Sequence, residues 1–502
     1  MTTLWIVAAL AVIHTIGIAV WFWPGHMPDT DSAGVWTALA DDVAHGDWYR
    51  PLFGPLGTGG TRYMPLFFAL HGAAIHAGAT PLAAGAALTL GTSAAFAVAL
   101  GALLRQLGIR RAIAWPAAAL MFGTVTFGML LLTVRGDFLA AALNLGGVAV
   151  ALRWREKGGN ALLLFAALLF AAAFLTKLTT IFGLVGVAGW MLHQREGGRS
   201  ARLLAVSAAL MAVGVALALQ VSEGRMLVVF RAVGHGGATT MSALSGPWRF
   251  ASECARDPLF CLFFVPGVAL ALATAGRVHV SLPRWLLAAT LLVTLVIYGS
   301  PGTSSNHLID LHAFAALQLA LAVEQGGRMR ACAGVALGVF GIGVVAPWLP
   351  GVPSIPAFFL RTGLPEAAAP GEFIRRAGSG ARPMLAENPL VPILAGERPF
   401  VADWFNLALM SRRDPAVREA ISARLRRGEF GSVVLTNWPV AFTHDVTSPA
   451  DPSIAAGWAE LEKEPRLFAE FYPLLQARYR VVSVRRPYVY FLRDDLPFAA
   501  SP

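Results

Sequence analysis

The chain has 502 residues, of which 56% are hydrophobic and only 14% are charged. Soluble domains carry roughly 25% charged residues, so this composition leaves too little polar surface for a water-soluble fold and indicates an integral membrane protein. The formal net charge of +10 comes from arginines scattered between apolar segments, which is typical of membrane topology and does not indicate nucleic-acid binding. We therefore expect membrane lipid, and no nucleic acid, among the partners.

Apolar segments of about 17–23 residues recur along the first two thirds of the chain, and this length matches the roughly 30 Å hydrocarbon core of a bilayer. The first segment lacks the positive region and the cleavage site of a signal peptide, so we interpret it as the first span. The predicted spans, about eleven, are residues 4–23, 82–104, 112–132, 138–152, 161–176, 179–192, 203–221, 258–275, 284–299, 308–323 and 331–348.

Positive charge alternates between the loops that connect these segments. Every second loop is basic, whereas the intervening short loops carry single cations. The positive-inside rule places the basic loops in the cytoplasm, which puts the N-terminus inside and the C-terminal tail outside. The basic loops contain Arg105, Arg110 and Arg111; Arg153, Arg155 and Lys157; Arg195, Arg199 and Arg202; Arg277 and Arg284; and Arg328 and Arg330.

Two predicted outer loops are long, residues 24–81 and residues 222–257. Within the first outer loop, residues 64–80 are apolar but short. Counting them as a full span would invert every later loop and place the arginines outside. We therefore expect a juxtamembrane or re-entrant helix on the outer face.

The composition changes after Pro350, where charge rises and apolar segments shorten. Residues 432–440 and 479–492 have the pattern of β-strands, and residues 415–430 predict an amphipathic helix that Gly428 ends. We expect a fold of two parts: a polytopic α-helical membrane domain (1–350), whose outer loop 24–81 carries juxtamembrane helices, and a small α/β domain (351–502) on the periplasmic face.

The sequence has three cysteines and no CxxC motif, which argues against zinc-ribbon and thioredoxin-like sites. Cys254 and Cys261 could form a disulfide if they face an oxidising compartment. The sequence leaves their state open.

Asp29 and Asp31 follow the first predicted span. Two carboxylates at this spacing could bind a divalent cation or supply a general base. Short acidic loops are common, however, and Asp31 also fits the N-cap of the helix predicted to follow it. No convincing third metal ligand is apparent. Whether a metal binds is therefore left open, with Asp29 and Asp31 as its ligands if it does.

Further ionisable groups lie at the predicted outer ends of spans, where they are costly to retain and hence candidates for function. Lys177 lies in a very short turn that the bundle should enclose, and an anionic phosphate is a plausible partner for it. Snorkelling, solvation, helix capping and polar helix packing are the structural alternatives. The other candidates in this group are Arg62, Arg135, Asp137, His235, His307 and Asp310.

Several stretches, taken together and in order, resemble the GT-C superfamily of integral membrane glycosyltransferases, close to glycosyltransferase family 39. That family includes protein O-mannosyltransferases and the aminoarabinose transferase that modifies lipid A. The stretches are DSAGVWTALADDVAHGDWYRP (31–51), RYMPLFFALHG (62–72), VRGDFLAAALNLGGVAVALRWRE (134–156), AAAFLTKLTTIFGLVG (171–186) and NHLIDLHAFAALQLALAV (306–323).

The resemblance implies a role for particular residues. Asp31, rather than Asp29, falls on the family's catalytic carboxylate. The resemblance also implies an inverting glycosyltransferase, which moves a sugar from a polyprenyl-phosphate donor to a hydroxyl on a lipid, a glycan or a protein. Lys177, Arg135, Arg62 and His235 would bind the donor phosphate, with Asp29, Asp137, His307 and Asp310 in support. Some members use a divalent ion and others do not, so no cofactor is required for certain.

We expect the protein in a bacterial inner membrane with its active site facing the periplasm. A transporter or lipid flippase without transferase activity is the main alternative, and a scaffold for cell-wall assembly is another. Transport would require charged groups along a path across the bundle, whereas the candidates gather at one side. The sugar and the acceptor are not identified by the sequence.

Overall fold

The computed structural model describes most residues of the chain. They are residues 2–22, 31–234, 240–256, 258–273, 281–300, 302–345, 369–377, 382–436, 441–442, 445–446, 450–463, 467–485 and 487–498.

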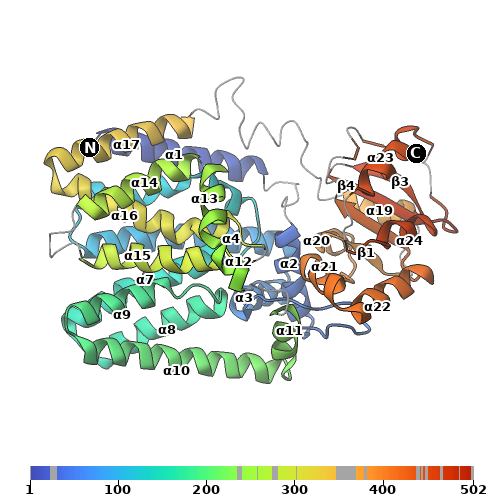
Figure 1. The fold of residues 1–502 in the computed structure, drawn as a ribbon, viewed down its shortest axis with the longest axis horizontal. Coiled ribbons are helices and arrows are strands. Elements are labelled where there is room, and N and C mark those ends of the chain that lie inside the picture. The colour runs from blue at the N-terminus through green and yellow to red at the C-terminus, as the bar shows by residue number, and fades with distance from the viewer. Residues whose placement is uncertain are drawn as a thin grey trace.

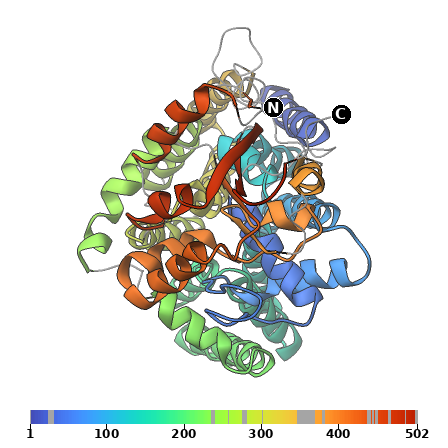
Figure 2. The same ribbon diagram turned by 90° about the vertical axis from the view of Figure 1, so that its right-hand side faces the viewer.

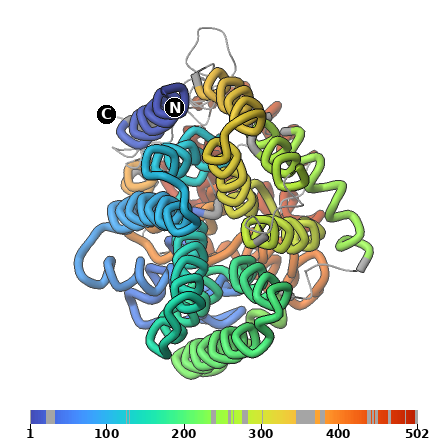
Figure 3. Tube along the Cα trace, turned by 90° about the vertical axis from the view of Figure 1, so that its left-hand side faces the viewer, coloured from blue at the N-terminus to red at the C-terminus, as the bar shows by residue number. Residues whose placement is uncertain are grey.

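A bundle of apolar helices occupies one end of the molecule, and a small sheet with its helices occupies the other (Figure 1). Figure 3 views the bundle from its far end and shows many helices almost end-on. Each apolar segment predicted from the sequence overlaps one or more helices of the described residues. The bundle helices are α1 (Thr2–Phe22), α4 (Pro81–Gln106), α5 (Arg111–Ala119), α6 (Val125–Leu131), α7 (Asp137–Lys157), α8 (Asn160–Thr176), α9 (Phe182–His193), α10 (Gly197–Val221), α14 (Pro258–Ala273), α15 (Ser281–Ile297), α16 (Ile309–Gln325) and α17 (Gly327–Val345).

Within the described residues, five helices are long and apolar enough to cross a membrane, and a bent pair of helices, residues 246–255 and 260–273, would add a sixth if it forms one span. On α10, apolar side chains such as Val213 and Leu217 are each 56% exposed, as expected of a surface that faces lipid. The protein is therefore a multi-pass membrane protein. The count of about eleven spans and their orientation remain predictions.

One predicted span is broken. Residues 112–132 form α5, the 3₁₀ turn η1 (Leu120–Gly123) and α6 instead of a continuous helix. Pro116 lies within α5, where it lacks an N–H for the helical ladder. Thr124 then adopts an extended conformation, and its hydroxyl accepts a hydrogen bond from the Phe127 N–H at 3.2 Å. Hydropathy alone did not indicate this break.

The first outer loop folds into α2 (Asp31–Ala44) and α3 (Pro65–His76), which pack against each other. At about 1.5 Å per residue, α3 is only about 18 Å long, too short to cross the roughly 30 Å core of a bilayer by itself. This agrees with a juxtamembrane or re-entrant helix. The two helices share a core that contains Trp36, Phe67 and Phe68.

The second long loop also contains helices. They are α11 (Arg225–Gly234), α12 (Thr240–Leu244) and α13 (Gly246–Arg256). Cys254 and Cys261 do not form a disulfide in this structure. The Cys261 thiol instead donates to the backbone oxygen of Cys254, with a separation of 3.2 Å.

The C-terminal part contains a four-stranded sheet in the order β1-β2-β4-β3. Strand β1 (Met384–Ala386) is parallel to β2 (Ser432–Thr436), whereas β4 (Tyr488–Arg493) is antiparallel to both β2 and β3 (Tyr479–Arg485). Residues 479–492, expected to be extended, therefore form two paired strands. The small α/β fold is confirmed, while the domain boundary near residue 350 stays a prediction.

Short helices accompany the sheet, and Figure 2 shows them lying with it over one end of the bundle. The predicted helix at 415–430 is present as α22, and Gly428 follows it with a φ of 62°, a conformation that glycine adopts without strain. The helices are α19 (Ala369–Ala377), α20 (Leu390–Leu394), α21 (Trp404–Arg413), α22 (Pro415–Arg426), α23 (Ser453–Leu461) and α24 (Phe471–Gln476).

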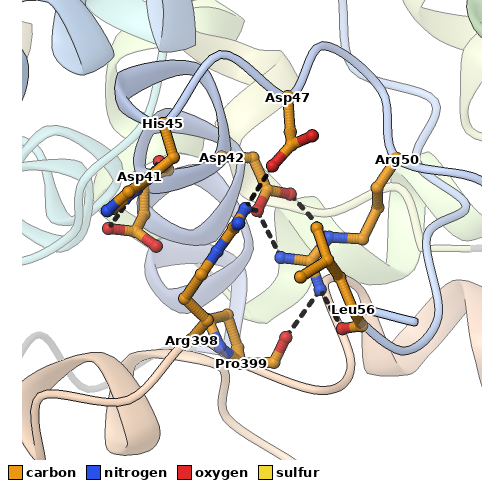
Figure 4. A network of polar contacts seen from close by, with 8 residues as sticks. All are labelled: Asp41, Asp42, His45, Asp47, Arg50, Leu56, Arg398 and Pro399. Carbon is orange, nitrogen blue, oxygen red and sulfur yellow. Dashed lines mark hydrogen bonds and ion pairs between the residues drawn. The ribbon is translucent and has the colours of Figure 1, made fainter. Parts of the chain in front are cut away.

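A buried ionic network joins the first outer loop to this domain (Figure 4). Asp42 of α2 forms a bidentate ion pair with Arg50, and both side chains are almost fully buried. Arg398 donates to Asp42 and to Asp47, each at 2.8 Å. Arg50 also donates to the backbone oxygen of Pro399 at 2.6 Å.

Backbone hydrogen bonds strengthen the same junction. The Thr58 N–H donates to the Phe400 oxygen at 2.7 Å, and the Ala402 N–H donates to the Thr58 oxygen at 3.0 Å. A Cβ on Gly57 would lie 2.0 Å from the Phe400 oxygen, so the two segments approach as closely as glycine allows. The outer loop and the C-terminal domain are thus packed as one unit.

We predict that this unit faces outward. In a variant whose native cysteines are replaced by serine, Glu470→Cys should react with a membrane-impermeant maleimide in intact cells. Arg199→Cys, on the basic side, should react only after permeabilisation. Both side chains are exposed to solvent. Labelling at position 199 in intact cells would invert the proposed topology.

Candidate functional site

A cavity of about 330 Å³ lies where the bundle meets the first outer loop and α11. This volume is at the lower end of the range of small-molecule sites. The lining combines cationic groups with apolar and aromatic side chains. The lining residues are Trp36, Arg62, Tyr63, Met64, Arg135, Gly136, Asp137, Thr176, Lys177, Leu178, Thr179, Phe230, Val233, Ile297, Ser300, Gly302, Thr303, Asn306 and His307.

Asp137 is the most highly coordinated charge in this cavity, and its side chain is only 4% exposed. Its Oδ1 accepts hydrogen bonds from Lys177 Nζ at 2.6 Å and from Asn306 Nδ2 at 2.8 Å. Its Oδ2 lies 3.2 Å from Arg135 Nε. The carboxylate therefore holds together three segments of the chain that are distant in sequence.

Local structure explains how these groups meet. Asp137 is the first residue of α7, where a carboxylate complements the positive end of the helix dipole. Lys177 is the C-cap of α8 in an extended conformation, so its side chain leaves the helix axis and reaches Asp137. Asn306 comes from the 3₁₀ turn η3 (Ser305–Leu308), just before α16. Each group sits at a helix end on the same side of the bundle.

Four buried polar atoms of the lining make no hydrogen bond within the described part of the chain: Trp36 Nε1, Thr179 Oγ1, His307 Nδ1 and Arg135 Nε, the last of which is ion-paired with Asp137. Buried polar groups almost always have a partner, whether protein, water or ligand. Together with the cations, these atoms suit a ligand that carries several oxygen acceptors.

The C-terminal domain contacts Arg62, one of the residues that line the cavity. The Arg62 guanidinium lies 5.3 Å from the centre of the Phe405 ring. Phe405 belongs to α21, and Asp403 is the N-cap of that helix, accepting from the Asn406 N–H at 3.0 Å. Burial raises the pKa of Asp403 to about 6, although the positive charge of Arg62 acts in the opposite direction.

Tyr63 lies beside these charges. Its ring packs against Trp36 with a centroid separation of 4.4 Å, and burial, followed by the negative charge of Asp403, raises its pKa to about 12. The phenol is therefore neutral at physiological pH and can act as a hydrogen-bond donor toward the cavity.

Five of the residues predicted from the sequence line this one cavity: Arg62, Arg135, Asp137, Lys177 and His307. Asp310 does not belong to the lining. The Asp310 carboxylate lies on α16, outside the cavity lining, and accepts a hydrogen bond from Asn144 Nδ2 at 3.1 Å. A supporting role of Asp310 in the site stays a prediction.

Asp31 is the first residue of α2, and Trp36 of the same helix lines the cavity. Five residues correspond to about 7.5 Å along a helix axis. The side chain of Asp31 lies outside the described parts of the structure, as do Asp29 and His235 entirely. Their predicted roles therefore remain predictions.

Other residues of the site were not found from the sequence. Trp36 and Phe230 read as ordinary apolar or aromatic positions, and Phe405 lies more than 340 positions from Arg62. A prediction of long-range contacts would be needed to place Phe405 against Arg62.

Among the described residues, no group of three or more His, Cys, Asp or Glu side chains is arranged to hold a metal ion. The side chains of Asp29 and Asp31, the predicted metal ligands, lie outside the described part of the structure. Metal dependence therefore stays open.

Comparison with known proteins rests on structure. No family model matches the sequence, and no curated protein matches it. The fold is similar to that of ArnT from Cupriavidus metallidurans bound to undecaprenyl phosphate, with a TM-score of 0.54, 12% identity and coverage of 98% of this chain and 99% of that chain.

It is also similar to the archaeal oligosaccharyltransferase AglB from Archaeoglobus fulgidus in complex with an inhibitory peptide and a dolichol-phosphate. The TM-score is 0.51, the identity is 12%, and the match covers 85% of this chain and 69% of that chain. Both neighbours are GT-C glycosyltransferases. The chain has the GT-C fold. The predicted resemblance to this superfamily is thereby confirmed at the level of the fold.

The buried carboxyl of Asp403 generates a testable pH dependence. Its folded-state pKa of about 6 exceeds the ordinary value of about 3.9, so the folded state holds this proton more tightly than the unfolded state. The stabilisation is present at low pH and is lost as pH rises through about 6.

We predict that the free energy of unfolding falls by about 1.4 kcal/mol between pH 5 and pH 7 because of this group. Asp403→Asn retains an N-cap oxygen and should lack this component. The measurement is chemical unfolding in detergent at each pH, wild type against variant. Parallel pH profiles for the two proteins would contradict the assignment.

Proposed function

We propose that the protein is an inverting glycosyltransferase that moves a sugar from a polyprenyl-phosphate donor to a hydroxyl acceptor at the outer face of the membrane. The observation that carries this proposal is the cationic cavity at one end of an apolar bundle with the GT-C fold. ArnT has been observed with undecaprenyl phosphate and AglB with a dolichol-phosphate. These ligands support a polyprenyl-phosphate donor for this chain.

The charges of the lining suit a phosphate that becomes more negative during the reaction. Arg62, Arg135 and Lys177 are cationic, and Asp137 supplies the opposing carboxylate. A sugar phosphodiester carries one negative charge, whereas a phosphomonoester carries about −1.5 to −2 at pH 7. Cations already in place stabilise the charge that develops on the leaving phosphate and require little reorganisation.

The chemical step can be written from these roles. The acceptor oxygen attacks the anomeric carbon, and the bond from that carbon to the phosphate oxygen breaks. The acceptor proton passes to the carboxylate of Asp31, which acts as general base, and the polyprenyl phosphate leaves. Direct displacement inverts the anomeric centre. His307 and Tyr63 would offer further hydrogen bonds to the phosphate or the sugar.

The acceptor is a lipid, a cell-envelope glycan or a protein, and the location is a bacterial inner membrane with the site facing the periplasm. The lining supports a transferase over a transporter or flippase, because its charges gather at one end of the bundle. A transport path would need polar groups through to the opposite end.

We predict that Asp31→Asn nearly abolishes transfer, by about 10²–10⁴-fold, because the general base is lost. The assay follows transfer of radiolabelled mannose or aminoarabinose from undecaprenyl phosphate to membrane acceptors, with and without a chelator. Asp29→Asn is the matched control and should stay active if no metal bridges the pair. Full activity of Asp31→Asn with a normal melting profile would refute the proposed base.

Lys177→Met should weaken binding of undecaprenyl phosphate by roughly 10–100-fold, because a charge-assisted hydrogen bond contributes about 1.5–3 kcal/mol. Asp137 keeps Arg135 and Asn306 as partners in this variant, so the fold should persist. Binding is measured by ligand-induced thermal stabilisation in detergent. The control is Lys157→Met, an exposed cation at the other end of α7. Equal loss in both variants would show that Lys177 has no specific role.

A further inference from the structure

The C-terminal domain contacts α2 near both of its ends. In the first turn, a Cβ on Gly34 would lie 2.0 Å from Asn388 Oδ1 and 2.9 Å from Pro389 Cδ. The helix therefore touches the segment that leads into α20, and only glycine permits this approach. Asn388 is itself held, because its Nδ2 donates to the Tyr488 hydroxyl at 2.7 Å.

Near the other end of α2, the contact is ionic. Arg398 donates from one nitrogen to Asp42 Oδ1 and to Asp47 Oδ2, each at 2.8 Å (Figure 4). Asp42 is already paired with Arg50 within the outer loop. The Asp42–Arg50 ion pair therefore forms within the outer loop, and Arg398 of the C-terminal domain adds a second cation to Asp42.

These two contacts fix the position of α2 along its own axis. A helix is stiff over fourteen residues, so a force at one end is transmitted to the other. Trp36 is the residue of α2 that lines the cavity. Asp31 is the first residue of the same helix. A displacement of about 1 Å at a reacting group can cost on the order of 10² in rate.

We propose that Arg398 is a positioning residue: through Asp42 and Asp47, the C-terminal domain sets the position of α2 and thereby that of Asp31 relative to the donor phosphate. This inference rests on the proposed function, in which Asp31 is the base. Arg398 touches neither substrate in this scheme. Its effect falls on the chemical step, whereas the cations that hold the donor lie on other segments.

A residue that only stabilised the fold would behave differently. Arg398 is 29% exposed, and its removal leaves Asp42 paired with Arg50, so no buried carboxylate loses all its cations. Arg398→Gln should consequently fold. Arg398→Lys retains one positive charge and should recover part of the lost rate. Arg426→Gln, which removes an exposed ion pair with Glu419 on the same domain, is the matched control.

The experiment measures three quantities on the full-length protein in detergent. They are the kcat and KM of sugar transfer from radiolabelled undecaprenyl-phosphate donors, the affinity for undecaprenyl phosphate, and hydrogen exchange of peptides covering residues 31–44. We expect Arg398→Gln to lower kcat by about 10–100-fold, with donor KM and undecaprenyl phosphate affinity changed less than twofold. Exchange over α2 should rise at least fivefold, while α3 stays protected.

Gly34→Ala tests the other contact independently. Its methyl group must push α2 away from Asn388 and should lower kcat in the same selective manner. Unchanged kcat and unchanged exchange in Arg398→Gln would overturn the proposal, as would a parallel loss of kcat, donor affinity and melting temperature. The exchange result does not depend on activity. If Asp31→Asn proves fully active while exchange over α2 rises in Arg398→Gln, the catalytic assignment fails and the contact itself stands.

Discussion

One buried carboxylate, Asp137, determines how the cavity is built. It joins the start of α7, the end of α8 and the turn before α16 through Arg135, Lys177 and Asn306. Burying charges is costly unless each one is paired with good geometry. Here the carboxylate compensates two cations only in part, so the cavity retains a net positive charge at the place where an anionic ligand would bind.

Much of the bundle was predictable, because apolar length and the distribution of arginine follow directly from the bilayer as a solvent. The break at Thr124 was not, because Pro116 and Thr124 leave the segment apolar as a whole. Residues 479–492 were expected to be extended, but the pairing of β3 with β4 depends on contacts across the sheet, which the sequence pattern does not specify.

The candidate site divides in the same way. Ionisable residues beside spans were identifiable because a membrane protein retains few of them, and five of them do share a cavity. Phe405, Asp403 and Arg398 belong to a different region of the chain, and no local pattern links them to Arg62 or Asp42. Their placement depends on how the C-terminal domain packs on the outer loop, which is a property of the whole fold.

The size of the cavity has a kinetic consequence. A volume of about 330 Å³ accommodates a sugar phosphate but not a long prenyl chain, whose remainder must stay among the lipid tails. Under the proposed function, donor and spent carrier would therefore reach and leave the protein by lateral diffusion within one leaflet. The relevant concentration is then the mole fraction of donor in that leaflet, and added phospholipid would act as a diluent even when the bulk concentration of donor is constant.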